Sequence, residues 1–267
     1  MIKNDVGSLL PRVTIVTVVR NGKDFIQETM DSVFSQDYKN IEYIVIDGFS
    51  TDGTMDILQT NQHQIDTLIS EKDQGIYYAM NKGIELSSGE LIGFLNASDI
   101  LYPDTISKLI FAYQKENFDY SFGPAHIEST EGSQVSISSP LKKIPVKSNS
   151  YIGMPSPHLS VYMKVSFIKS LGMFNTQFRL SSDYDLLLRA IKRSNHIWFF
   201  DKPIGAFRLG GVSGSYGTYF ENFLVMRKNN IQWFMSIYVT AKGLAGLFFR
   251  NNLPSGLYTF IKRLSKC

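Results

Sequence analysis

The chain has 267 residues, of which 43% are hydrophobic and 19% charged, and its formal net charge at pH 7 is +3. This composition excludes wholesale disorder, and the length suits one large α/β domain with an appendage or two closely joined domains. The only cysteine, Cys267, is the last residue, which excludes an internal disulfide framework and a thiolate metal cluster.

Strand and helix patterns alternate through the first half of the chain. Residues 13–19 form a continuous β-branched run, typical of a strand buried on both faces, and further strands are predicted at 41–46, 67–70 and 91–95. Helices are predicted after Asn21, whose side chain can cap the first one, from about Thr54, over 76–86, and from Pro103 to about Gln114. This alternation predicts a mostly parallel central sheet flanked by helices.

Polar clusters follow four of the predicted strands, at residues 20–21, 47–52, 71–74 and 96–99. Ligands of such sheets bind beyond the carboxyl ends of the strands, so these loops are predicted to form one site. Further along, a hairpin is predicted around Ser129–Ser133, and residues 151–213 carry more helices and strands, expected to supply the acceptor side.

The segment Asp47-Gly-Phe-Ser-Thr-Asp-Gly-Thr54 follows a buried strand and opens a helix. Alone, it could be a connector in which Asp47 and Asp52 bond local backbone N–H groups. Together with Glu71–Gly83 and Phe94–Asp99, it resembles the nucleotide-binding half of family 2 glycosyltransferases, and the resemblance covers about residues 12–213.

The resemblance implies a GT-A fold with a Rossmann-like half, a nucleotide-diphosphate-sugar donor, UDP-linked by preference, and inversion at the anomeric carbon. We expect a nucleotide-sugar-binding half at 1–123, an acceptor-binding half of the same domain at 124–213, and a helical tail at 214–267. The residues expected to bind the donor are Thr17, Asn21, Asp47, Asp73, Asn81, Asn96 and Ser98.

The metal motif departs from the family pattern. Where the family often carries Asp-x-Asp-Asp, this chain reads Asn96-Ala-Ser-Asp99, which leaves one carboxylate. Mg²⁺ commonly uses one or two carboxylates plus phosphates and water, so Asp99 is the predicted ligand of a Mn²⁺ or Mg²⁺ ion. The alternative is that Asp99 caps a helix starting near Tyr102.

A second motif, Arg179-Leu-Ser-Ser-Asp-Tyr-Asp-Leu-Leu-Leu-Arg189, places Asp183 in the first turn of a predicted helix, where a carboxylate is electrostatically favoured. It resembles the family's Glu-Asp-x-x-Leu element, with Ser182 where Glu is usual, and this implies that Asp183 is the catalytic base. The alternative is an ordinary helix-terminal acid. Asp185 points roughly 200° away on helical spacing and is expected to be structural.

Three further residues are predicted on the acceptor side or near the diphosphate. His158 falls where relatives place a histidine before an acceptor-side strand, although a structural histidine is an equal alternative. Arg208-Leu-Gly-Gly-Val-Ser213 resembles the family's closing loop, whose glycines allow close backbone approach, and Arg208 or Ser213 is expected to meet the diphosphate.

The tail is basic and aromatic. From Asn222 to Cys267 there are seven basic residues and no Asp or Glu, so residues 1–221 carry a net charge of −4. The apolar run 231–249 is interrupted by Gln232, Lys242 and two glycines and makes a poor spanning helix. Aromatic side chains interleaved with Lys and Arg instead suit the surface of an anionic bilayer. A helical pair packed on the catalytic body, or a homodimer contact, is the alternative.

These features predict a cytoplasmic enzyme, peripheral at the inner face of the cytoplasmic membrane, since the first residues show no apolar segment of signal-peptide length. The resemblance points to bacterial surface polysaccharide or lipopolysaccharide (O-antigen) assembly on a glycan or polyprenyl-linked acceptor. Nucleic-acid binding has little support beyond the basic tail.

Rival functions fit less well. A nucleotidyltransferase should show an early Gly-rich basic loop, whereas Val18–Gly22 has one glycine and one arginine, and no Gly-x-Gly-x-x-Gly of a dehydrogenase follows the first strand. A non-catalytic sugar-nucleotide-binding relative stays open, because Asn96, Ser98 and Ser182 replace the usual acids.

Overall fold

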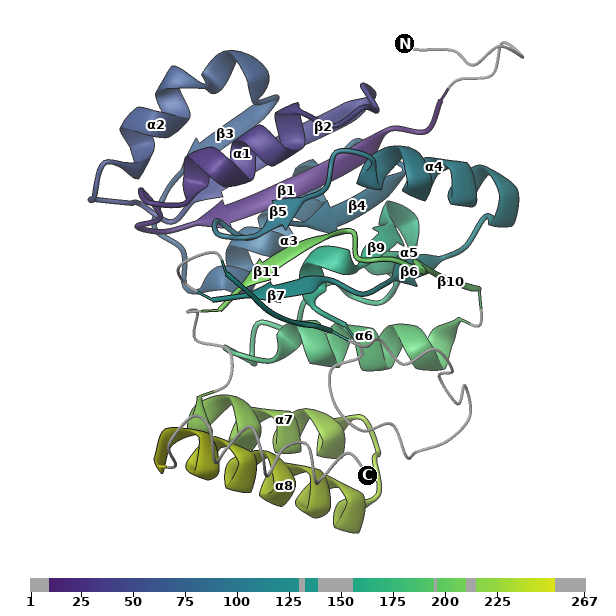
Figure 1. Cartoon of the computed structure of the whole chain (residues 1–267). Helices are drawn as coiled ribbons and strands as arrows, with labels where there is room; N and C mark the ends of the chain where they lie inside the picture. The colour runs from purple at the N-terminus through teal and green to yellow at the C-terminus, as the bar shows by residue number, and fades with distance from the viewer. Residues whose placement is uncertain (1–9, 130–132, 139–155, 195, 210–214, 253–267) are drawn as a thin grey trace.

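A computed structural model of the chain describes residues 10–129, 133–138, 156–194, 196–209 and 215–252. Its centre is a seven-stranded sheet in the order β10-β6-β9-β4-β1-β2-β3 (Figure 1). The strands are β1 (Val13–Val19), β2 (Ile41–Asp47), β3 (Thr67–Ser70), β4 (Leu91–Phe94), β6 (Tyr120–Phe122), β9 (Tyr162–Lys164) and β10 (Ile197–Phe199). All neighbours pair in parallel except β9, which runs antiparallel to both β4 and β6. The predicted, mostly parallel sheet is confirmed.

The seven residues of β1 are all buried, and their alternation builds two cores. Val16 and Val18 point into a cluster shared with α3 (Ile76–Leu86) and α6 (Ser182–Arg193). Val13, Ile15 and Val19 point to the other face, against α1 (Ile26–Phe34) and α4 (Thr105–Glu116). Gly83 lets α3 approach β1, because a Cβ there would lie 2.5 Å from Val16 Cγ1. The sheet is therefore covered on both faces, as the apolar run of β1 predicts.

A second, four-stranded sheet lies beside the first in the order β5-β11-β7-β8. It consists of β5 (Ile100–Leu101), β7 (His126–Glu128), β8 (Gln134–Ile137) and β11 (Gly205–Arg208). β7 and β8 pair antiparallel across residues 129–133, so the predicted hairpin is confirmed. β5 follows the end of β4 in the sequence, and β11 pairs with β5. This sheet therefore brings residues near 99 and 208 together.

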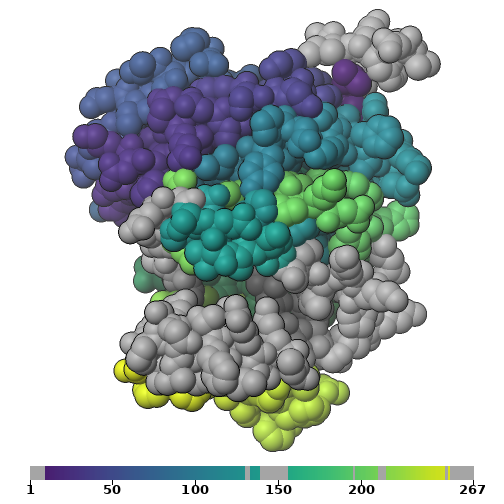
Figure 2. Space-filling model, viewed as in Figure 1, coloured from purple at the N-terminus to yellow at the C-terminus, as the bar shows by residue number. Residues whose placement is uncertain are grey.

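The remaining helices are α2 (Thr54–Thr60), α5 (Val165–Ser170), α7 (Tyr216–Lys228) and α8 (Trp233–Asn252), with short 3₁₀ turns at Gln62–Gln64 and His158–Ser160. α7 and α8 lie side by side as a separate layer beneath α6 (Figure 1) and form the yellow-green lower end of the molecule in the space-filling view (Figure 2). In the part of the chain that the structure describes, no helix is long and apolar enough to cross a membrane.

Two capping predictions are wrong. α1 begins at Ile26 after Phe25, and Asn21 instead adopts a left-handed backbone (φ 53°) and accepts a hydrogen bond from the Thr51 N–H at 2.9 Å. Asn21 therefore ties the end of β1 to the turn after β2. α4 begins at Thr105 after Asp104, so Asp99 does not cap it.

Candidate active site

A cavity of about 510 Å³ opens where the ends of β1 and β4 meet α3, α6 and β11. Its polar lining includes Arg20, Asn21, Asn96, Ser98, His158, Asp183 and Arg208, and its floor is apolar, from residues such as Ile92, Met163 and Leu187. A smaller cavity of about 380 Å³ adjoins it and is lined by Asp73, Gln74 and Tyr78. Arg20, Tyr77 and Arg179 line both cavities, so the two are direct neighbours.

Asp183 lies in the first turn of α6, as predicted, and faces the larger cavity. Its Oδ1 accepts hydrogen bonds from the Tyr77 hydroxyl at 3.0 Å and from the Tyr184 N–H at 2.9 Å. Both contacts fall on Oδ1, which leaves Oδ2 available to an incoming hydroxyl group. Burial raises the pKa of Asp183, against the lowering effect of His158 and of these two donors. A carboxylate with a raised pKa at a cavity wall suits a general base.

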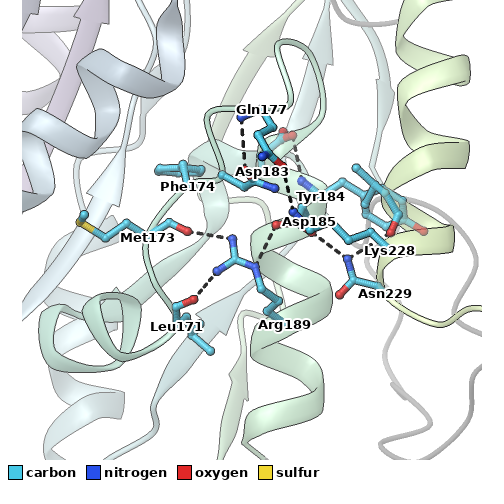
Figure 3. A network of polar contacts seen from close by, with 12 residues as sticks. Leu171, Met173, Phe174, Gln177, Asp183, Tyr184, Asp185, Arg189, Lys228 and Asn229 are labelled. Atoms are coloured by element: carbon cyan, nitrogen blue, oxygen red, sulfur yellow. Dashed lines mark hydrogen bonds and ion pairs between the residues drawn. The ribbon is translucent and has the colours of Figure 1, made fainter.

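Asp185 is held in the protein interior, away from this role. One of its oxygens accepts from Arg189 Nε at 2.8 Å and the other from Asn229 Nδ2 at 2.8 Å (Figure 3). Arg189 also donates to the carbonyl oxygens of Leu171 and Met173. Asp185 is 1% exposed and fully engaged, so the prediction that it is a structural partner is confirmed.

Asp99 is buried beside the cavity, behind Asn96, Ser98 and His158, which line it. Its Oδ1 accepts from the Arg208 N–H at 3.3 Å, whereas Oδ2 is buried, has no hydrogen-bond partner and lies 3.7 Å from His158 Nε2. Burial raises the pKa of Asp99 to about 8. A buried polar atom without a partner costs free energy, and such an atom next to a cavity marks a place for a ligand.

His158 lies in the short 3₁₀ turn before β9 and lines the cavity. Burial lowers its pKa, although the nearby charge of Asp183 opposes this effect, so the ring is neutral near pH 7. Its Nε2 is buried without a hydrogen-bond partner. His158 thus lies 3.7 Å from Asp99 and is close enough to Asp183 for the two groups to shift each other's pKa, which neither position in the sequence indicates by itself.

A divalent cation would find oxygen ligands near Asp99. Asn96 Oδ1 and Asp99 Oδ2 are both buried and unpaired, and both are hard oxygen donors. Among the described residues, however, no group of three or more His, Cys, Asp or Glu side chains could hold a metal ion. The residues therefore fit a cation that takes most of its ligands from donor phosphates and water.

The two aspartates of the turn after β2 accept hydrogen bonds from groups in and around that turn. Asp47 has no exposed surface and accepts hydrogen bonds from the Ser50 N–H at 3.0 Å, from the Ser50 hydroxyl and from the Ser70 hydroxyl at 2.7 Å. Asp52 accepts from the backbone N–H groups of Thr54 and Lys23 at 3.0 Å. The connector interpretation of this motif thus describes what its side chains do in this structure.

The other predicted donor residues are divided between the cavities and the interior. Asp73 lines the smaller cavity, with Oδ1 bonded to Lys82 Nζ at 2.8 Å and Oδ2 buried and unpaired. Thr17 is fully buried and accepts from the Tyr43 hydroxyl, and Asn81 exchanges hydrogen bonds with the backbone of Phe174. These side chains are engaged with other protein groups, and none of Thr17, Asn81 and Asp47 lines either of the two cavities described above.

Arg208 lines the cavity at the end of β11, but its guanidinium is already paired. It donates to Glu28 at 2.9 Å and lies 3.8 Å from Glu128. The hydrogen bond and charge of Glu28 raise its pKa. The neighbouring Ser213 lies outside the described residues.

No role was predicted from the sequence for two positively charged residues and one phenol that the structure places at the cavities. Arg20 and Arg179 line both cavities, and Tyr77 bonds Asp183. Tyr77 lies in the Glu71–Gly83 motif, which pointed to the right segment, but its partner is 106 residues away. That contact depends on how α3 and α6 pack and leaves no local signal.

Comparison with known proteins agrees with this geometry. The family model described as "Glycosyl transferase family 2" matches residues 14–170. TuaG of Bacillus subtilis (strain 168), named as a glycosyltransferase of teichuronic acid biosynthesis, is 30% identical over 125 residues, 46% of this chain and 50% of TuaG. A PGL/p-HBAD biosynthesis glycosyltransferase of Mycobacterium bovis (strain BCG / Pasteur 1173P2) is 27% identical over 187 residues, 67% of this chain and 69% of that protein. The match thus spans half to two-thirds of these relatives.

Two solved structures share the fold. S. aureus TarS 1–349 in complex with UDP-GlcNAc superimposes with a TM-score of 0.65 at 17% identity, over 90% of this chain and 74% of that one. The mannosyltransferase PcManGT from Pyrobaculum calidifontis, in complex with GDP-Man and Mn²⁺, gives a TM-score of 0.62 at 15% identity. The superposition covers 97% of this chain and 81% of PcManGT. The predicted GT-A fold is confirmed.

Proposed function

Because the chain belongs to glycosyl transferase family 2, we propose that it transfers a sugar, with inversion, from a nucleotide-diphosphate sugar to a glycan or lipid-linked glycan of the cell surface. The observation that carries this proposal is Asp183, a partly buried carboxylate whose Oδ1 alone accepts hydrogen bonds, on a cavity that also reaches the ends of β1 and β4. A UDP-sugar is the favoured donor, in line with the UDP-GlcNAc bound to TarS.

The chemistry follows from the placement of charged groups. The acceptor oxygen attacks the anomeric carbon from the face opposite the diphosphate, the new C–O bond forms as the old one breaks, and the electron pair leaves with the diphosphate. Asp183 Oδ2 takes the acceptor's proton, and Tyr77 keeps the carboxylate oriented through Oδ1. Much of the rate should come from holding the two substrates in line.

The leaving diphosphate needs positive charge. Arg20 and Arg179 line both cavities and can supply it, and Arg208 also lines the larger cavity. We propose that Asn96 and Asp99 hold Mn²⁺ or Mg²⁺ together with the donor. When bound, such an ion stabilises the negative charge of the diphosphate.

The donor site can be tested by thermal unfolding of the full chain with UDP, GDP and dTDP, each with and without Mn²⁺. We expect UDP with Mn²⁺ to raise Tm by several degrees, since saturation at about 100 times Kd adds roughly 2.7 kcal/mol to the free energy of unfolding. Stabilisation by none of the nucleotides would contradict a donor site and favour another function for this fold.

We further propose that α8 contacts the inner face of the cytoplasmic membrane. The side chains on its outward face are Trp233, Phe234, Ile237, Tyr238, Ala241, Lys242, Ala245, Phe248 and Phe249, and all are exposed. The face is apolar apart from one lysine, whereas a water-facing helix side is normally polar. Its opposite side packs on α7, where a Cβ on Gly243 would lie 2.2 Å from Tyr219. α7 in turn packs on α6, so the pair lies on the catalytic body and still presents an apolar face, in a stretch of sequence that has no Asp or Glu from Asn222 onward.

Flotation with vesicles of phosphatidylcholine, with and without phosphatidylglycerol, tests this contact. We expect the full chain to bind the anionic vesicles, and replacing Phe248 and Phe249 by serine to weaken binding on the order of tenfold. Phe111→Ser is the matched control, because Phe111 is 74% exposed on α4, far from this face in sequence. Equal loss in both variants, or a concentration-dependent dimer without vesicle binding, would contradict the proposal.

A further inference from the structure

Glu221, on α7, binds three consecutive backbone amides with one carboxylate. Its Oε1 accepts from the Arg179 N–H at 2.9 Å, and its Oε2 accepts from Leu180 and Ser181 at 2.6 and 2.8 Å. The contacts span 40 to 42 residues of sequence and join two separate layers of the fold. Hydrogen bonds to an ionised carboxylate are shorter and stronger than neutral ones, so this is a firm attachment.

The three amides belong to the segment that leads directly into α6, two residues before Asp183. Ser181, at the N-cap of α6, makes no side-chain capping hydrogen bond. The hydroxyl groups of Ser181 and Ser182 are buried without a partner among the described residues. The segment is thus held from outside, by Glu221, and not by the capping that a helix start normally uses.

α7 also holds α6 further along. Asn229, directly after α7, donates to Asp185, and Lys192 of α6 donates to the Asn229 carbonyl oxygen (Figure 3 shows the contacts around Asp185). At the other end, α7 approaches closely, since a Cβ on Gly217 would lie 3.2 Å from Leu180 Cδ1. Attachment at both ends fixes the position and the rotation of α6, and so the direction in which Asp183 points.

We propose that Glu221 is a positioning residue for Asp183. Its carboxylate holds residues 179–181 so that the first turn of α6 presents Asp183 to the acceptor, and through it the α7–α8 pair takes part in transfer. The inference rests on the proposed function, in which Asp183 is the base. Glutamine is a sharp probe, because its NH₂ group cannot accept the amide hydrogen bonds that one carboxylate oxygen now accepts.

The positional claim is tested by hydrogen–deuterium exchange of the full chain. In Glu221→Gln, we expect the amides of Arg179, Leu180 and Ser181 to exchange roughly tenfold faster or more, because hydrogen bonds to a charged group are lost. Amides of α2 serve as an internal reference. Glu85→Gln makes the same charge change on the exposed end of α3 and should leave exchange at 179–181 unchanged. Unchanged exchange in Glu221→Gln would overturn the proposal.

The functional claim is tested by UDP release from UDP-GlcNAc, with water as acceptor, in a double-mutant cycle. Glu221→Gln should lower kcat at least tenfold with little change in KM for the donor, and should add nothing in an Asp183→Asn background. An equal loss in both backgrounds would overturn the proposal, because it would show that Glu221 does not act through Asp183. If Asp183→Asn keeps the wild-type rate, the assignment of the base fails. If the wild type releases no UDP, the assigned donor fails, and the exchange experiment still decides the role of Glu221.

Discussion

The turn after β2 and the surroundings of the cavity both carry aspartates, but these carboxylates differ in how many hydrogen bonds they accept. In the turn, Asp47 and Asp52 accept hydrogen bonds from nearby amides and hydroxyl groups. At the cavity, Asp99 Oδ2 has no partner and Asp183 is bonded through Oδ1 alone. A buried unpaired oxygen such as Asp99 Oδ2 costs free energy and marks where a ligand is expected. The role of an aspartate in a motif thus depends on which of its oxygens have no hydrogen-bond partner in the protein.

The largest effect is expected at Asp183. Asp183→Asn keeps the shape and the bond from Tyr77 but removes the base, so kcat should fall by roughly 10²–10⁴-fold. Nucleotide affinity, measured by calorimetry with UDP and Mn²⁺, should stay within about twofold because the donor side is untouched. A near wild-type rate in this variant would place the base elsewhere.

A smaller effect is expected at Asp99. Asp99→Asn should weaken Mn²⁺-dependent nucleotide binding roughly 10–100-fold, by analogy with losses at other metal sites, and should not affect binding without the metal. The metal-free protein should not be destabilised, because burying the Asp99 carboxyl already costs free energy in the wild type. Calorimetric titration with UDP, with and without Mn²⁺, measures the two affinities separately. If the variant binds UDP with Mn²⁺ as tightly as the wild type does, Asp99 is excluded as a metal ligand.

A substitution in the turn after β2 should change the stability of the protein and not its catalytic rate. Asp47→Ala leaves the Ser50 N–H and two hydroxyl groups without their acceptor and should lower the free energy of unfolding by roughly 1–3 kcal/mol. The kcat of the folded fraction should change by less than about threefold. Urea unfolding and initial rates on the same samples check both, and an intact Tm with lost nucleotide affinity would return Asp47 to the donor site.

The smallest effect is expected in how the stability of the folded protein depends on pH near neutrality. The raised pKa of Asp99, about 8, means that the folded metal-free protein holds a proton that the unfolded chain has released. Stability should therefore fall as pH rises from about 4 to about 8, with Asp99 contributing roughly 1 kcal/mol of this fall between pH 7 and 8. Asp99→Asn should make this slope shallower in urea titrations at several pH values.

Most of the framework followed from the residues. The β-branched run of β1, the alternation of strands and helices, and the polar clusters after the strands predicted the sheet and the edge at which the site forms, because these patterns depend on burial and local geometry. Asp183 at a helix start and Asp185 on its far side also followed from helical spacing.

The tertiary structure decided which of these polar side chains are satisfied. Asn21 and Asp47 stabilise turns, Thr17 and Asn81 are engaged inside the protein, and Asp99 is left unpaired near His158. β9 reverses direction within the sheet, and Tyr77 and Glu221 reach α6 from 106 and about 40 residues away. A hydrogen bond needs a partner within about 3 Å, and partners so distant in sequence are set by how helices and strands pack, not by their order along the chain.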